Sequence, residues 1–282
     1  MRLFALRGGS APLGGRLAFA IGSPLIEQLL VWNPALRRKH ELVAVRTQFL
    51  DKAIEDALPL RQQFVIVGAG LDSRPFRMRD ALLETSTFEV DFPGMLSAKR
   101  QLFRSSGFDY DKLLPAQEIG TGAGGDGERG RGVWHVGVDL SLEGWQSALI
   151  AKGFDSTKPA IWLLEGFTGY LTEAELLALL RVISHLSAAS SRLAATWLTP
   201  GGEHLSMHRF TTRNPTHILE PFGWAEVQVQ TLQQAASSIH ADAPPPRGGV
   251  GEREERGGDE RRPDLESEVR DYLYLLSCHE KR

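Results

Sequence analysis

Short runs of apolar residues recur along the chain, separated by segments whose apolar residues return every three or four positions. The clearest run, Phe64 to Val67, ends at Gly68, which is typical of a strand buried on both faces of a sheet. Runs of the same kind predict further strands at 87–90, 134–138, 160–164 and 193–197. Helical spacing predicts helices at 40–58, 75–83, 95–103, 142–150 and 173–186, the last with Thr172 as its N-cap. Strands that alternate with helices favour a mainly parallel sheet with helices on both faces.

The pattern weakens after Trp197, where two final strands are predicted at 224–232 and 271–278. The total is then seven strands. Two segments have little to bury: residues 120–132 are rich in glycine and charge, and residues 242–263 combine three consecutive prolines with charges of both signs. Their ordering entropy would go uncompensated, so both are predicted to be flexible insertions.

Composition bounds the class of protein. The chain has 282 residues, and Lys and Arg total 32 against 35 Asp and Glu, a net charge of -3, so no nucleic-acid partner is expected. No apolar stretch is long enough for a membrane span, and no membrane partner is expected. The single cysteine, Cys278, excludes an internal disulfide and indicates a reducing, cytoplasmic location. Residues 1–26 are predicted to be flexible. They contain three arginines and no acid, which leaves an organelle transit peptide as an alternative.

A metal site is not expected either. The eight histidines include no HExxH pattern. His204 and His208 share a helical face, but the sequence suggests no third metal ligand.

A glycine turn follows the first predicted strand in the segment FVIVGAGLDSR, residues 64–74. Gly68 and Gly70 let the backbone turn tightly and approach a ligand at the carboxyl end of the strand, where open α/β sheets bind ligands. A dinucleotide fingerprint needs a third glycine three positions after the second, and Ser73 stands there instead. NAD is therefore disfavoured. Asp91 ends the second strand 21 residues after Gly70, the spacing at which an acid reaches a ribose diol beside such a turn.

Polar residues also end the next two strands. Asp139 and Leu140 follow the third strand, and Glu165 follows the fourth. Because the carboxyl ends of parallel strands converge on one crevice, these residues describe an adenosine site. Asp139 suits the exocyclic amine of adenine and Leu140 offers the ring an apolar face. No lysine follows the glycine turn as in a phosphate-binding loop. An adenosine without phosphates points to S-adenosyl-L-methionine, whose sulfonium cation suits the surrounding acids.

Five ordered motifs resemble the leucine carboxyl methyltransferase family: RTQFLD (46–51), VIVGAGLDSRPFR (65–77), FEVDFP (88–93) with Lys99 downstream, VDL (138–140) with Trp145, and WLLEGFTGYL (162–171). The resemblance implies a class I methyltransferase domain over residues 27–282. Its fold would be α/β, a doubly wound, mainly parallel, Rossmann-like sheet of seven strands, with the last strand antiparallel between the fifth and sixth. It also implies S-adenosyl-L-methionine as the cofactor.

The resemblance assigns roles position by position. Arg46 matches the arginine that meets the methionyl carboxylate, and Glu165 the acid near the methionyl amine. The remaining cofactor contacts that it implies are Gly68, Gly70, Asp91, Asp139 and Leu140. Tyr170 matches a tyrosine that helps to hold the acceptor. Two departures from the family pattern, Ser73 in place of threonine and FTG at 167–169 in place of a more aliphatic pair, bear on the acceptor geometry.

The expected function is methyl transfer to an oxygen of a small-molecule or peptide acceptor, either a carboxylate or a hydroxyl. A carboxylate needs no general base, whereas a hydroxyl needs one, for which His135 and His204 are candidates. Two other readings are open: a cofactor-binding pseudoenzyme or interaction module, and an NAD-type oxidoreductase.

Overall fold

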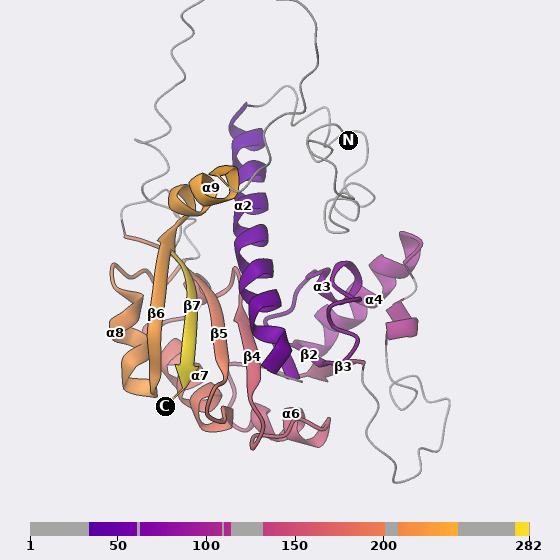
Figure 1. Ribbon diagram of the computed structural model, residues 1–282. Coiled ribbons are helices and arrows are strands. Elements are labelled where there is room, and N and C mark those ends of the chain that lie inside the picture. The colour runs from indigo at the N-terminus through magenta and orange to yellow at the C-terminus, as the bar shows by residue number, and fades with distance from the viewer. Residues whose placement is uncertain are drawn as a thin grey trace, which may run out of the picture.

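The computed structural model describes residues 34–60, 63–108, 110–113, 132–200, 208–241 and 274–281. Within these ranges lies one seven-stranded sheet with the strand order β3-β2-β1-β4-β5-β7-β6 (Figure 1). The strands are β1 (Gln63–Val67), β2 (Ser86–Asp91), β3 (Val133–Gly137), β4 (Ala160–Leu164), β5 (Arg192–Trp197), β6 (Trp224–Thr231) and β7 (Tyr274–Lys281). Each overlaps a strand predicted from the sequence.

The first five strands pair in parallel, whereas β7 pairs antiparallel with both β5 and β6. This arrangement confirms the predicted fold class, including the last strand inserted in reverse between the fifth and sixth. The carboxyl ends of β1, β2 and β4 therefore lie side by side at one edge of the sheet.

The helices are α2 (Pro34–Ala57), α3 (Arg74–Arg77), α4 (Pro93–Ser105), α6 (Trp145–Ala151), α7 (Glu173–Leu186), α8 (Pro215–Leu219) and α9 (Leu232–Ala241). Short 3-10 turns occur at Leu58–Leu60, Tyr110–Leu113, Thr168–Tyr170 and Glu220–Phe222. None of these described helices is both long enough and apolar enough to cross a bilayer.

The sheet separates two hydrophobic cores because alternate residues of a strand point to opposite faces. Val65 and Val67 of β1 pack on one face with apolar residues of α6 and α7. Phe64 and Ile66 pack on the other face with residues of α2. Figure 1 shows α2 running roughly along the strands with α9 beside it; α2 packs on one face of the sheet, and α9 rests on α2 through Leu232. The helix that carries Arg46 is thus fixed from two sides.

The helix predicted at 75–83 is wrong in extent, because α3 ends at Arg77 and the chain continues in turns as far as Glu84. Met78 and Leu82 are both buried, so their apolar spacing reflects burial of successive turns and not a continuous helix. The helices α8 and α9 were not predicted. The segments 1–26, 120–131 and 242–263 lie outside the described residues, as does His204, and their predicted roles stay predictions.

The predicted cap of α7 is present in full. The Glu175 backbone N–H donates to Thr172 Oγ1 at 3.3 Å, and the Thr172 backbone N–H donates to Glu175 Oε2 at 2.6 Å. Such a capping box satisfies two N–H groups that the first turn of a helix leaves without partners.

We expect Thr172→Ala to lower the free energy of unfolding by about 1 kcal/mol, because the side-chain acceptor is lost while the helix remains. Chemical denaturation followed by circular dichroism measures the change. Thr172→Ser, which keeps the hydroxyl, is the control and should stay close to wild type. Equal stability of the alanine variant and wild type would show that the cap contributes nothing.

Candidate functional site

The glycine turn and Asp91 meet as the sequence predicted. The Gly70 backbone N–H donates to Asp91 Oδ2 at 2.7 Å, and the Phe92 N–H donates to Asp91 Oδ1 at 2.7 Å. Gly68 N–H donates to the Val90 carbonyl at 2.9 Å and so ties the turn to the end of β2. The carboxylate is therefore held beside the turn, and each oxygen keeps a further lone pair for a ligand.

Gly68 is required by both conformation and space. Its φ of +68° lies in the left-handed region, and a Cβ at this position would lie 2.9 Å from Cδ1 of Phe167. The Phe167 ring thus packs directly on the glycine turn. It belongs to the FTG segment that departs from the family pattern.

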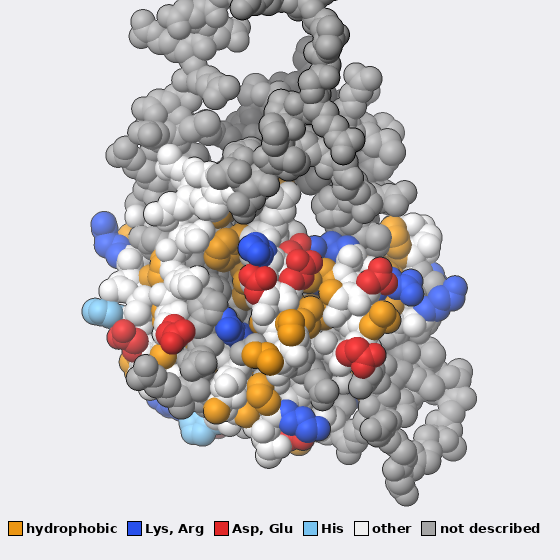
Figure 2. Space-filling view, viewed as in Figure 1, with side chains coloured by type: hydrophobic (Ala, Val, Ile, Leu, Met, Phe, Trp, Pro, Cys, Tyr) orange, Lys and Arg blue, Asp and Glu red, His pale blue; other side chains and the backbone are white. Residues whose placement is uncertain are grey.

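A cavity of about 480 Å³ lies between α2, the turn after β1 and the segment after β4. Its lining includes Arg46, Gly68, Gly70, Glu165 and Phe167. Figure 2 shows acidic and basic side chains beside hydrophobic ones across the middle of the face in this view. The structure therefore brings together four of the residues predicted to bind the cofactor.

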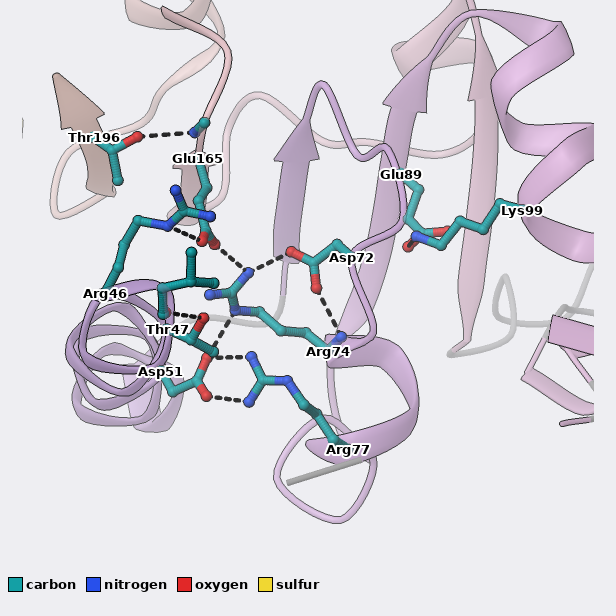
Figure 3. A network of polar contacts seen from close by, with 12 residues as sticks. Arg46, Thr47, Asp51, Asp72, Arg74, Arg77, Glu89, Lys99, Glu165 and Thr196 are labelled. Carbon is teal, nitrogen blue, oxygen red and sulfur yellow. Dashed lines mark hydrogen bonds and ion pairs between the residues drawn. The ribbon is translucent and has the colours of Figure 1, made fainter. Parts of the chain in front are cut away.

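Glu165 is the centre of an ionic network at this cavity (Figure 3). Its Oε1 accepts from Arg46 Nε at 2.7 Å, and its Oε2 lies 2.7 Å from Arg74 Nη1. The Gly166 backbone N–H, next in sequence, donates to Thr196 Oγ1 at 2.8 Å. The two arginines reach Glu165 from α2 and from the first residue of α3, so the carboxylate joins both helices to the segment that follows β4.

Arg74 is the most buried member of the network, with 3% of its side chain exposed. Its Nε donates to Asp51 Oδ1 at 2.8 Å, and Nη1 also bonds Asp72. The Asp72 carboxylate accepts a further bond from the Arg74 backbone N–H at 2.7 Å. Arg77 completes the network as a second partner of Asp51.

Two members of the network, Arg74 and Asp72, have pKa values shifted by their neighbours. Burial by itself would lower the pKa of Arg74, but the carboxylates of Asp72, Glu165 and Asp51 raise it well above its usual value. Burial likewise opposes ionisation of Asp72, yet the positive charge of Arg74 leaves the pKa of this carboxyl below its usual value. Arg74 and Asp72 are therefore charged at neutral pH and form an ion pair in the wall of the cavity.

Four residues of the network were not predicted as site residues: Asp51, Asp72, Arg74 and Arg77. All four stand inside two of the motifs that carry the family resemblance, RTQFLD and VIVGAGLDSRPFR. The available signal was the occurrence of acids and arginines in both motifs. Only the fold shows that they face one another.

Four predicted residues are not among the described residues that line this cavity: Asp91, which lies beside the glycine turn, and Asp139, Leu140 and Tyr170. The Asp139 carboxylate accepts from the Ser141 hydroxyl at 2.6 Å and from the Ser141 backbone N–H at 2.9 Å, and these bonds lower its pKa. Leu140 packs against the main core. The Tyr170 ring is 40% exposed and lies edge-on to His208, with ring centroids 4.9 Å apart.

A second polar cluster lies beneath Asp91. Glu89 and Lys99 are completely buried, with Lys99 Nζ 2.5 Å from Glu89 Oε1. Glu89 Oε2 accepts from the Tyr110 hydroxyl and lies 3.1 Å from His135 Nε2. Burial raises the pKa of Glu89, but the Lys99 charge and the His135 hydrogen bond outweigh it and hold the pKa below its usual value. Burial and the Glu89 charge raise the pKa of Tyr110.

This cluster fixes the end of β2 against α4 and β3, because its residues come from all three elements and from the 3-10 turn Tyr110–Leu113. His135 is engaged with Glu89 and does not belong to the described lining of the cavity.

Comparison with protein families gives one match that covers more than half of the chain. The family described as Leucine carboxyl methyltransferase matches residues 31–184. A relative in Streptomyces avermitilis is 31% identical over 229 residues, which is 77% of this chain and 72% of the relative. A relative in Streptomyces coelicolor is 38% identical over 170 residues, which is 58% of this chain and 52% of the relative. Both names place these relatives among the S-adenosyl-L-methionine-dependent methyltransferases. The chain spans about half the length of several curated relatives that it matches.

A solved structure from Thermobifida fusca, titled as a methyltransferase, supports the fold. Its TM-score is 0.52 at 16% identity, with 86% of this chain and 82% of that chain covered. At this level of identity the likeness concerns the fold alone.

We expect Lys99→Met to lower the free energy of unfolding by about 3–5 kcal/mol, because it leaves the buried Glu89 carboxylate without its cationic partner. Denaturant titration at pH 7 measures the loss. Since the folded-state pKa of Glu89 lies below the usual 4.5, its stabilising contribution is present above that pH and is lost as the pH falls through the folded-state value.

The double variant Glu89→Gln with Lys99→Met is the control. It removes both charges and should be more stable than Lys99→Met alone. A Lys99→Met variant as stable as wild type would show that the ion pair does not hold this region together.

Proposed function

The chain belongs to the leucine carboxyl methyltransferase family, and from this we propose that it transfers a methyl group from S-adenosyl-L-methionine to an oxygen atom of an acceptor. The observation that carries the proposal is the placement of Asp91. Its carboxylate is held at the glycine turn by the Gly70 N–H, at the adjoining carboxyl ends of β1 and β2. A ribose diol bound beside such a turn would meet this carboxylate.

The residues around the turn suit the adenosine half of the cofactor. Asp91 would accept hydrogen bonds from the ribose hydroxyls, and Gly68 and Gly70 would allow close approach to the backbone. Asp139 and Leu140, which follow the neighbouring strand β3, would meet the adenine. Exposed apolar side chains also follow β1, β2 and β3, namely Leu71, Phe92 and Leu142. They offer the ring contact surface at the same edge of the sheet.

The residues at the cavity suit the amino-acid half. Arg46 and Glu165 form an ion pair with each other, and both line the cavity. Arg46 would bind the carboxylate of the cofactor and Glu165 its amine. A zwitterionic end can replace one ion pair by two, which keeps the total charge of the site unchanged. Separating these two partly buried ions without giving each a new partner would be costly, so the exchange favours a ligand that carries both charges.

When bound, S-adenosyl-L-methionine supplies a methyl group activated on a sulfonium. The chain itself then has to hold the acceptor in line and exclude water. Phe167, packed on Gly68 and lining the cavity, would supply an apolar wall there. Tyr170, the first residue beyond the FTG segment, would hold the acceptor.

We favour a carboxylate acceptor, on a small molecule or a peptide, over a hydroxyl. A hydroxyl must lose a proton, and His135 is engaged with the buried Glu89. Two backbone N–H groups hold the Asp91 carboxylate beside the glycine turn, and the charges at the cavity are paired. Both features favour an enzyme over an interaction module. Ser73 in place of a third glycine disfavours NAD. The single cysteine supports a cytoplasmic location.

We expect Asp91→Asn to weaken binding of S-adenosyl-L-homocysteine by about 10- to 100-fold, because one charge-assisted hydrogen bond of about 1.5–3 kcal/mol is lost. Isothermal titration measures the change. Asp91→Ala would remove the acceptors of both the Gly70 and the Phe92 N–H groups, whereas asparagine keeps one oxygen, so the alanine variant should lower the stability more.

Asp80→Asn is the matched control, since it makes the same chemical change at a side chain that is 93% exposed. Its affinity should stay within about threefold of wild type. Unchanged affinity in a folded Asp91→Asn variant would remove the ribose assignment.

We expect the methyl group transferred from radiolabelled cofactor to be released as methanol by mild alkali, because a methyl ester hydrolyses under these conditions. An alkali-stable label on oxygen would replace the carboxylate by a hydroxyl acceptor. A label on nitrogen would contradict oxygen methylation. Cofactor binding without transfer to any acceptor tested would favour the pseudoenzyme.

A further inference from the structure

One guanidinium nitrogen of Arg74 has no hydrogen-bond partner within the part of the chain that the structure describes. Its Nε and Nη1 are bonded to Asp51, Asp72 and Glu165, whereas Nη2 is buried and has no hydrogen-bond partner among the described residues. Arg74 lines the cavity together with Arg46 and Glu165. A buried donor without an acceptor is costly, so a nitrogen in this position needs an explanation.

The geometry of the guanidinium determines what could satisfy Nη2. The group is planar and its five N–H donors have fixed directions, so the bonds of Nε and Nη1 also fix the orientation of Nη2. Because Nε and Nη1 are taken, only the two N–H groups of Nη2 remain for a ligand, and a negatively charged carboxylate oxygen is the acceptor that forms the strongest bond with them. The three nearby carboxylates are already engaged, Asp51 with Arg77 as well as Arg74 and Glu165 with Arg46.

We propose that Arg74 is a second carboxylate-binding residue, whose Nη2 donates to the carboxylate at the amino-acid end of the cofactor beside Arg46. The proposal rests on the proposed function and assigns a residue that neither the sequence motifs nor the family resemblance had given a role. The proposal also implies that the network discriminates between ligands by their charge.

The charge balance of the network supports this selectivity. Three arginines, Arg46, Arg74 and Arg77, face three acids, Asp51, Asp72 and Glu165, so the six side chains together are neutral (Figure 3). An amino-acid end brings one amine and one carboxylate and leaves that balance intact. A ligand with the amine but without the carboxylate would bring an uncompensated positive charge and leave Nη2 unpaired.

The test compares S-adenosyl-L-methionine with its decarboxylated form, which keeps the adenosine, the sulfonium and the amine. Isothermal titration of the full chain should show that wild type binds the carboxylate-bearing ligand at least about tenfold more tightly. In Arg74→Lys, which keeps the positive charge but lacks the planar fork, this preference should fall by about 10-fold or more. The affinity for the decarboxylated ligand should stay within about threefold.

Two further variants separate binding from support. Arg79→Lys makes the same chemical change at a side chain that is 67% exposed and outside the network, and it is the control, with the preference expected to persist. Arg46→Lys, at a residue whose side chain is 26% exposed, should reduce the preference without abolishing it, because Arg74 remains. This variant tests the proposal even where Arg74→Lys does not fold.

The outcomes distinguish the alternatives. If Arg74→Lys weakens both ligands equally, Arg74 only supports Glu165, and the proposal is overturned. It is overturned as well if wild type has no preference between the ligands, or if Arg46→Lys abolishes the preference completely. If wild type binds neither ligand, the proposed function fails and the inference fails with it.

Discussion

The site depends on the ion pairs that the Glu165 carboxylate forms with two arginines. The carboxylate bonds Arg46 on α2 and Arg74 on α3, while the next residue is tied to β5 through Thr196. Taking these charges out of water is costly, and the cost is offset only because each buried carboxylate oxygen has a partner of opposite charge. Packing of α2 on the sheet and formation of the cavity are therefore coupled. A change that moves α2 also moves the cationic side of the site.

The sheet was readable from the sequence because its parallel strands are buried on both faces and stand out as unbroken apolar runs. All five residues of β1 and of β4 are buried. The extent of α3 was not readable, since the spacing of Met78 and Leu82 records burial and not backbone conformation. α9 follows β6 without any intervening loop, but it carries a usable signal. Thr231 and Gln234 exchange hydrogen bonds at 2.8 and 3.2 Å, a capping box of the same kind as at Thr172.

Contacts at the site could be predicted from the sequence where the spacing of residues along the chain reflects the order of the strands. Asp91 meets Gly70 because β1 and β2 are neighbours in register, so their ends coincide. Arg74 was not readable in this way. Its partners include Asp51 on a helix that precedes the sheet and Glu165 that follows β4, and their proximity follows from the packing of α2. The same holds for Glu89, which sits two residues before Asp91 and was quoted in a motif. Its partners Tyr110 and His135 come from elements brought together only by the fold.

The place of β7 bears on the order in which the chain can fold during synthesis. Among the strands that the structure describes, β6 joins the sheet only through β7, which lies between it and β5. While the chain emerges from the ribosome, β1 to β5 can pair as soon as they appear, but β6 has no strand to pair with until residues 274–281 follow. Both β5 and β6 therefore present unpaired edges during this interval, which is the period of greatest exposure to aggregation. The half of the sheet that carries the glycine turn and Asp91 can form before β7 is synthesised.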